Sequence, residues 1–312
     1  MFLDAPNPTQ LQFVPPRKRA NPPPPLILIH DGGGTTFSYF LLGNLHRDVW
    51  AIHNPKHGDD SVWEGGIDGM AKHYISLILQ AGITGSIVLG GWSFGGYMSI
   101  AIARLLADDS SVNLQIAGLL IIDAPYHRSV SDDMLDEYEN EREGTPEPFF
   151  KDSSNPLMQK SFESTCLMLV CWDLPSWDAP VCQGRTMHVV LPQRSFILQQ
   201  GDVLHKPLGG AWKPVTTATH PPPTVNVENP ATVPPAVMLR CTQPTRGVYD
   251  EFRDEKLLGW ESRYPEFIKA VIDIDAEHYT VFDKFDSAKM KNLTLQVKDG
   301  LRILDNMRVF SE

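Results

Sequence analysis

The segment Gly91-Trp92-Ser93-Phe94-Gly95 has the residue types and spacing of a nucleophile elbow. An apolar run precedes it at 86–91 and a stretch of small and apolar residues follows it at 97–103, which predicts a strand, a sharp turn and a buried helix. Such a turn leaves no room for a Cβ atom two residues on either side of the serine. Ser93 would then stand at a helix N-terminus, where backbone N–H groups favour a developing negative charge. A chance match is the alternative, and both flanks argue against it.

A glycine-rich loop precedes the elbow by one strand-helix-strand unit. Residues 25–30 predict a short buried strand that opens into Asp31-Gly32-Gly33-Gly34, at the sheet edge where ligands bind in open α/β folds. Without a Cβ atom, the backbone N–H of Gly32 or Gly33 can approach a tetrahedral oxyanion. The amide of Phe94, directly after the serine, would be the second donor. The alternative is an ordinary flexible loop.

Two aspartates compete as the acid partner of the serine. Residues 117–123 predict a strand that ends in Asp123, about 30 residues after Ser93 and hence one strand-helix unit further on. The next predicted strand, 236–241, has no acid at its tip, and Asp250 follows only after a further turn. We take Asp123 as the acid and keep Asp250 as the weaker candidate. A local turn-forming role is the alternative for Asp123.

His278 has the position expected of a general base, because it follows the apolar segment 267–274 and precedes the predicted last helix. His30 ends the strand before the glycine loop, and we expect it to orient that loop through a hydrogen bond. No histidine pair has metal-ligand spacing, so nothing points to a zinc mechanism. Surface or structural roles are expected for the histidines that have no motif around them: His53, His57, His188, His205 and His220.

These motifs together resemble the thioesterase domains that release products from polyketide synthases and nonribosomal peptide synthetases. The Gly-Gly-Trp-Ser sequence of the elbow and the Ile-Asp-Ala-Pro sequence around Asp123 are most similar to fungal members. The resemblance covers about residues 25–130 and 235–310. In that family the acid commonly follows the strand after the elbow, which agrees with Asp123. Asp31 stands where many relatives have glycine.

The resemblance implies an α/β-hydrolase fold and a thioesterase of polyketide-type secondary metabolism. Ser93 would attack a thioester carbonyl, His278 would accept its proton, and Asp123 would fix the imidazole tautomer. The substrate would be an acyl chain on the phosphopantetheine of an acyl-carrier protein of a polyketide synthase, or the acyl-pantetheine thioester itself. No cofactor is implied. Two alternatives stay open: a carboxylesterase or lipase acting on oxygen esters with the same triad, and a catalytically idle hydrolase fold that binds a partner.

Composition limits the partners. The chain has 312 residues and a formal net charge of −11, without a basic stripe that could neutralise nucleic-acid phosphates. No apolar run has the length needed to cross a bilayer, and the first residues do not resemble a secretory signal. Four cysteines are scattered without a framework, which is typical of a reducing compartment. We therefore expect a cytosolic protein that binds neither nucleic acid nor membrane.

Strand and helix patterns alternate along the chain, which predicts an α/β fold with a mostly parallel sheet and helices on both faces. Residues 1–24 are predicted to be a proline-rich tail. Residues 25–126 and 235–312 would form the hydrolase core, and 127–234 would be an insertion that covers Ser93 as a lid.

The two halves of this insertion differ in composition. In its first half, an acidic segment at 131–138 and an apolar one at 157–172 predict helices, and the apolar one could line an acyl pocket or simply pack on the core. The second half, 176–234, is rich in proline, threonine and glutamine with weak periodicity. We expect a disordered loop there that contributes little to the core, or an error in the gene model.

Overall fold

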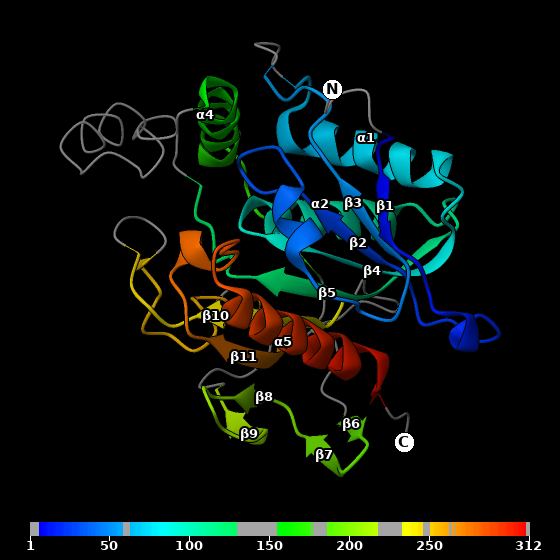
Figure 1. Ribbon diagram of the computed structural model, residues 1–312, viewed down its shortest axis with the longest axis vertical. Coiled ribbons are helices and arrows are strands. Elements are labelled where there is room, and N and C mark those ends of the chain that lie inside the picture. Colours follow the sequence, from blue (N-terminus) through cyan, green and yellow to red (C-terminus); the bar gives the residue numbers. More distant parts are fainter. Residues whose placement is uncertain are drawn as a thin grey trace.

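The computed structural model describes residues 6–58, 63–129, 155–175, 177, 186–217, 233–245, 250–261, 264 and 266–309. A nine-stranded sheet forms the centre of this part of the chain (Figure 1). In spatial order its strands are β1 (Thr9–Gln12), β3 (Val49–Ile52), β2 (Leu26–Ile29), β4 (Gly85–Trp92), β5 (Leu114–Ile122), β10 (Ala236–Cys241), β11 (Ile268–Ile274), β8 (Asp202–Lys206) and β9 (Lys213–Thr216). Every neighbouring pair from β3 to β8 is parallel, and only the edge strands β1 and β9 pair antiparallel.

Most residues of the inner strands are apolar and buried, because both faces of the sheet are covered. All four residues of β2 and all seven of β11 are buried. A continuous apolar run such as that of β2 is typical of parallel strands between two helical layers. The predicted α/β class with a mostly parallel sheet is thus confirmed, and the fold is α/β-hydrolase-like.

Helices lie on both faces of the sheet. Within the described residues, the α-helices are α1 (Gly66–Gln80), α2 (Phe94–Asp108), α4 (Pro156–Val170) and α5 (Ser287–Asp305). Leu120 and Ile121 are neighbours on β5. A Cβ atom at Gly96 of α2 would lie 3.2 Å from Ile121, whereas one at Gly300 of α5 would lie 2.9 Å from Leu120. Successive strand residues point to opposite faces, so α2 and α5 pack on opposite sides of the sheet. None of the helices in the described residues is long and apolar enough to cross a membrane.

The structure differs from the expectation of a tail at the N-terminus. Within 1–24, Thr9–Gln12 forms edge strand β1 on β3, and Pro16–Lys18 forms a short 3-10 helix. The edge pairing depends on backbone hydrogen bonds, which a four-residue polar segment supplies without an apolar pattern.

The predicted insertion, 127–234, contains more regular structure than expected. The apolar segment at 157–172 is helical up to Val170, as α4. The helix expected at 131–138 lies outside the described residues. Within 176–234, residues 186–217 form four strands rather than a structureless loop: β8 and β9 extend the large sheet, and a second sheet joins β6 (Met187–Leu191) and β7 (Arg194–Leu198) to β12 (Met307–Val309). Val189 and Leu204 are fully buried, so this part does contribute to the core.

Candidate active site

Ser93 lies at a sharp turn between β4 and α2. Its φ of 54° falls in the left-handed region, which non-glycine residues adopt only where the surroundings impose it. A Cβ atom on Gly91 would lie 2.7 Å from the backbone of Gly95, and one on Gly95 would overlap the carbonyl oxygen of Ile29. The two glycines are therefore required for steric reasons, and the predicted strand, sharp turn and buried helix around Ser93 are confirmed.

His278 connects the serine to the acid. Its Nε2 lies 3.0 Å from Ser93 Oγ, and its Nδ1 lies 2.8 Å from Asp123 Oδ2. Because an ionised carboxylate only accepts hydrogen bonds, Nδ1 carries the ring hydrogen and Nε2 is left to accept the hydroxyl proton of Ser93. The structure thus brings the three residues predicted from three distant parts of the sequence into one hydrogen-bonded chain.

The loop after β11 fixes the position of His278. The residue starts the short 3-10 helix His278–Thr280, whose first turn is closed by reciprocal bonds between Glu277 and Thr280. The backbone N–H of His278 also donates to Thr245 Oγ1 at 2.8 Å. Its ring packs near those of Trp92 and Tyr279. The imidazole is completely buried, so its orientation is set by the protein rather than by water.

Asp123 follows the last residue of β5 and is also completely buried. Burial acts to raise the pKa of its carboxyl group. The hydrogen bonds from His278 and Arg253 and the charge of the arginine outweigh burial, and they hold the pKa below its ordinary value. The weaker candidate, Asp250, does not contact His278 among the described contacts; its carboxylate accepts from Thr245 and Arg253 instead.

The glycine loop after β2 presents one amide rather than two. The N–H of Gly33 donates to the Asp31 carboxylate at 2.8 Å, so it is not available to an oxyanion. Among the described residues, the N–H of Gly32 has no acceptor. Of the two alternatives drawn from the sequence, this geometry favours Gly32, together with Phe94 at the first position of α2.

His30 and Asp31 shape this loop from its first turn. His30 Nδ1 lies 2.5 Å from the carbonyl oxygen of Asp31, and Nε2 lies 2.6 Å from the hydroxyl of Tyr74, as expected of a residue that orients the loop. Burial lowers the pKa of His30 to about 4, so the ring is neutral at ordinary pH. Burial also raises the pKa of the Asp31 carboxyl to about 7, against the lowering effect of the Gly33 hydrogen bond.

Helix α4 lies against the same loop. Ser161 Oγ and Thr165 Oγ1, one helical turn apart, each donate to the carbonyl oxygen of Gly32 at 3.2 Å. A Cβ atom on Gly32 would lie 2.7 Å from the ring of Phe162. The carbonyl oxygen of Gly32 is thus held by α4, and the N–H of Gly33, in the same peptide, is held by Asp31.

Sequence reasoning did not identify four residues that support the site: Ser161, Thr165, Thr245 and Arg253. Ser161 and Thr165 could have been noticed in the sequence, because their spacing places two hydroxyl groups on one face of a mostly apolar predicted helix. Arg253 carried no such signal. It meets Asp123 across 130 residues of chain, and only the placement of the segment after β10 determines that contact.

A Ser-His-Asp chain at the carboxyl edge of a mostly parallel sheet, with a glycine loop beside the serine, is the arrangement of α/β-hydrolase-fold serine hydrolases. Within that class, the thioesterase domain family model matches residues 24–154. The chain is 41% identical over 280 residues to a probable thioesterase KK1J of Curvularia clavata, covering 87% of each protein. It is 38% identical to a probable thioesterase lcsE of Purpureocillium lilacinum, covering 88% of this chain and 86% of that one. The chain therefore belongs to a family of fungal thioesterases.

A solved structure agrees on the fold. The thioesterase domain NocB from the nocardicin cluster superposes with a TM-score of 0.51 at 16% sequence identity, covering 88% of this chain and 94% of that one. At this identity the likeness shows the shared fold alone. The protein is thus a thioesterase by family, with a Ser93-His278-Asp123 arrangement suited to acyl transfer.

Proposed function

We propose that this thioesterase releases an acyl chain from the phosphopantetheine thioester of a carrier protein in polyketide-type secondary metabolism, with Ser93 as nucleophile, His278 as base and Asp123 as acid. The observation that carries the catalytic assignment is the continuous chain of hydrogen bonds from Ser93 Oγ through His278 to Asp123. Family membership supports thioester chemistry. The resemblance of the sequence motifs around Ser93 and Asp123 supports the polyketide-type pathway.

In the acylation step, Ser93 Oγ attacks the thioester carbonyl carbon while its proton passes to His278 Nε2. Asp123 holds the Nδ1 hydrogen and stabilises the imidazolium that forms. The amides of Gly32 and Phe94 then stabilise the oxyanion of the tetrahedral intermediate. Collapse of the intermediate breaks the carbon–sulfur bond, and the pantetheine thiolate takes the proton from His278.

In the second step, water or a nucleophile on the acyl chain itself resolves the acyl-serine. His278 again removes the proton from the attacking group and returns it to Ser93 Oγ. Water gives a free acid, whereas an internal hydroxyl or amine gives a ring. The chemistry of the triad is the same in both cases, so the outcome depends on how the cover over Ser93 admits water and positions the chain.

We further propose that 25–126 and 235–312 form the catalytic core and that 127–234 is an insertion covering it. The bonds from α4 to Gly32 support a cover close to the oxyanion side of the site. Its half-buried Phe162 is in reach of the glycine loop and would be among the side chains that an acyl chain meets. A cytosolic setting agrees with the finding that no disulfide joins the cysteines in the described part of the chain.

The test compares two thiol esters with one oxygen ester. Wild type should label with a fluorophosphonate and should turn over acyl-pantetheine and acyl-carrier-protein thioesters better, by kcat/KM, than the matching p-nitrophenyl ester. Ser93→Ala should lose labelling and nearly all turnover, whereas Ser76→Ala, a change at an exposed serine, should keep both. Preference for the oxygen ester would support the carboxylesterase alternative. Absence of labelling in folded wild type would support the idle fold.

A further inference from the structure

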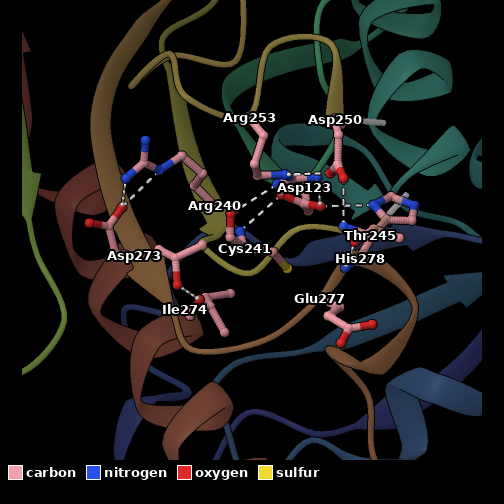
Figure 2. A network of polar contacts seen from close by, with 12 residues as sticks. Asp123, Arg240, Cys241, Thr245, Asp250, Arg253, Asp273, Ile274, Glu277 and His278 are labelled. Atoms are coloured by element: carbon pink, nitrogen blue, oxygen red, sulfur yellow. Dashed lines mark hydrogen bonds and ion pairs between the residues drawn. The ribbon is translucent and has the colours of Figure 1, made fainter. Parts of the chain in front are cut away.

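The carboxylate of Asp123 has partners in addition to His278 (Figure 2). It accepts hydrogen bonds from the backbone N–H of Cys241 at 2.9 Å and from both terminal nitrogens of Arg253, Nη1 to Oδ1 at 2.6 Å and Nη2 to Oδ2 at 3.1 Å. Two parallel bonds of this kind need the planar fork of a guanidinium group, which lysine lacks. Arg253 therefore fixes the plane of the carboxylate as well as its place.

Asp250 extends this network back to the histidine. Its Oδ1 accepts from Arg253 Nε at 3.2 Å, and its Oδ2 accepts from the backbone N–H of Thr245 at 2.7 Å. Thr245 Oγ1 in turn accepts from the backbone N–H of His278 at 2.8 Å. The contacts thus form a closed ring through Asp123, Arg253, Asp250, Thr245 and His278, part of which is visible in Figure 2.

The ring carries charges of both signs beside a group that must take up a proton. The Asp123 and Arg253 side chains are 0% and 7% exposed, so water screens their charges weakly. The positive charge of Arg253 opposes a second positive charge on His278. The negative charge of Asp250, which contacts the same guanidinium group, offsets this opposition.

We propose, on the basis of the proposed function, that Arg253 and Asp250 are a pair of positioning residues with opposite electrostatic effects: Arg253 fixes Asp123 and limits protonation of His278, and Asp250 restores part of the negative charge that the imidazolium needs. The pair thereby sets the acidic limit of activity. Its members act through Asp123 and His278 and do not touch the substrate.

Other titratable groups near His278 leave this assignment intact. On β10, burial raises the pKa of the Cys241 thiol well above its usual range, so the thiol stays neutral. On α5, Lys289 reaches Thr280 Oγ1 at 3.5 Å, and it is common to all variants compared below. Beside His278 in the chain lie Glu277, which caps the turn, and Tyr279, whose ring packs against that of His278; both are common to all variants compared below. On the glycine loop, His30 is neutral and Asp31 titrates near pH 7, so the pH profiles are also measured in an Asp31→Asn background.

The experiment measures kcat/KM against pH with an acyl-pantetheine thioester. Protonation of His278 removes the base, so activity falls at low pH, and this fall is the acidic limb of the profile. Any change that favours protonation of His278 moves the acidic limb to higher pH. Arg253→Met should move the limb up by about one pH unit, and Asp250→Asn should move it down. The double variant keeps only the negative charge of Asp123, which equals the net charge of Asp123, Asp250 and Arg253 in wild type. Its acidic limb should therefore lie between those of the two single variants. Both single variants should also lower kcat at the plateau.

Arg240→Met is the matched control. Arg240 forms another partly buried ion pair, to Asp273 at 2.8 Å, on the neighbouring strands β10 and β11. Its loss should cost stability without moving the acidic limb. Shifts of the same sign in Arg253→Met and Asp250→Asn, or no shift in either, would overturn the proposal if wild type shows the serine labelling and thioester turnover expected of the proposed function.

A second variant addresses the case in which Arg253→Met does not fold. Arg253→Lys keeps the positive charge but loses the two parallel bonds. It should leave the acidic limb near that of wild type while lowering kcat, since the carboxylate is no longer held in its plane. A large upward shift of the limb in Arg253→Lys would show that charge is not the quantity through which Arg253 acts.

Discussion

On one side of Ser93, the Asp123 carboxylate is fixed by the charged side chain of Arg253, from the segment after β10. On the other side, the carbonyl of Gly32 is fixed by two neutral hydroxyl groups from α4. Charge-assisted bonds in a buried setting are roughly twice as strong as neutral ones, and they leave an unpaired charge when one partner is lost. We expect the acid side to be rigid and costly to disturb, and the oxyanion side to follow the position of α4.

The largest effect is expected from the acid itself. Asp123→Asn should lower kcat by about 10³- to 10⁴-fold, because an amide at this position favours the wrong imidazole tautomer. Asp250→Asn should cost much less, since Asp250 acts only through Arg253 and Thr245. Steady-state kinetics on variants with wild-type circular dichroism tests this order. If Asp250→Asn were the slower enzyme, Asp250 would be the functional acid.

Elements with a clear apolar pattern could be predicted from the sequence, and elements without one could not. Ser93, Asp123 and His278 each follow an apolar strand, and periodicity and chain order were enough to place them. The predicted strands of the central sheet and the predicted last helix, α5, are confirmed for the same reason. Short, polar edge strands such as β1 and β9 carry little apolar pattern, because they bury few side chains and depend on backbone pairing.

Residues that support the site were harder to predict than the residues they support. Arg253 and Thr245 act through contacts between segments that are distant in sequence, and their residue types are ordinary for a surface turn. The choice between Gly32 and Gly33 as oxyanion donor was likewise open, since it depends on which of the two N–H groups donates a hydrogen bond to the Asp31 carboxylate. Such details follow from side-chain packing, which no spacing rule encodes.

On the oxyanion side, we expect the next largest effect from Gly32→Ala. The added Cβ atom would lie 2.7 Å from the Phe162 ring, so either the loop or α4 must move. Displacing an oxyanion donor should lower kcat by about 10²-fold with a smaller change in KM. Phe162→Leu in the same chain should recover part of this loss, and Phe162→Leu alone is the control. A double variant as slow as Gly32→Ala would show that contact with α4 is not the cause.

A smaller effect is expected from the α4 hydroxyls. Ser161→Ala combined with Thr165→Val leaves the Gly32 carbonyl without either donor, which should cost about 1–2 kcal/mol of stability and about tenfold in kcat. The exposed Ser164→Ala on the same helix is the matched control. Urea unfolding and thioester kinetics should change together. A loss of stability with unchanged kcat would mean that α4 packs on the loop without positioning it.

The smallest effect concerns the pH dependence of stability on the oxyanion side. Burial raises the pKa of Asp31 to about 7 in the folded protein, well above its value in the unfolded chain. Between about pH 4 and pH 7 the Asp31 carboxyl therefore binds more protons in the folded state than in the unfolded state. The contribution of Asp31 to the free energy of unfolding thus falls as pH rises through this window. An asparagine side chain cannot ionise but can still accept the Gly33 N–H, so Asp31→Asn should be less sensitive to pH over this range, by on the order of 1 kcal/mol. Urea unfolding of both proteins at pH 5 and pH 7.5 measures the difference, and equal pH dependence in the two would show that Asp31 is ionised throughout.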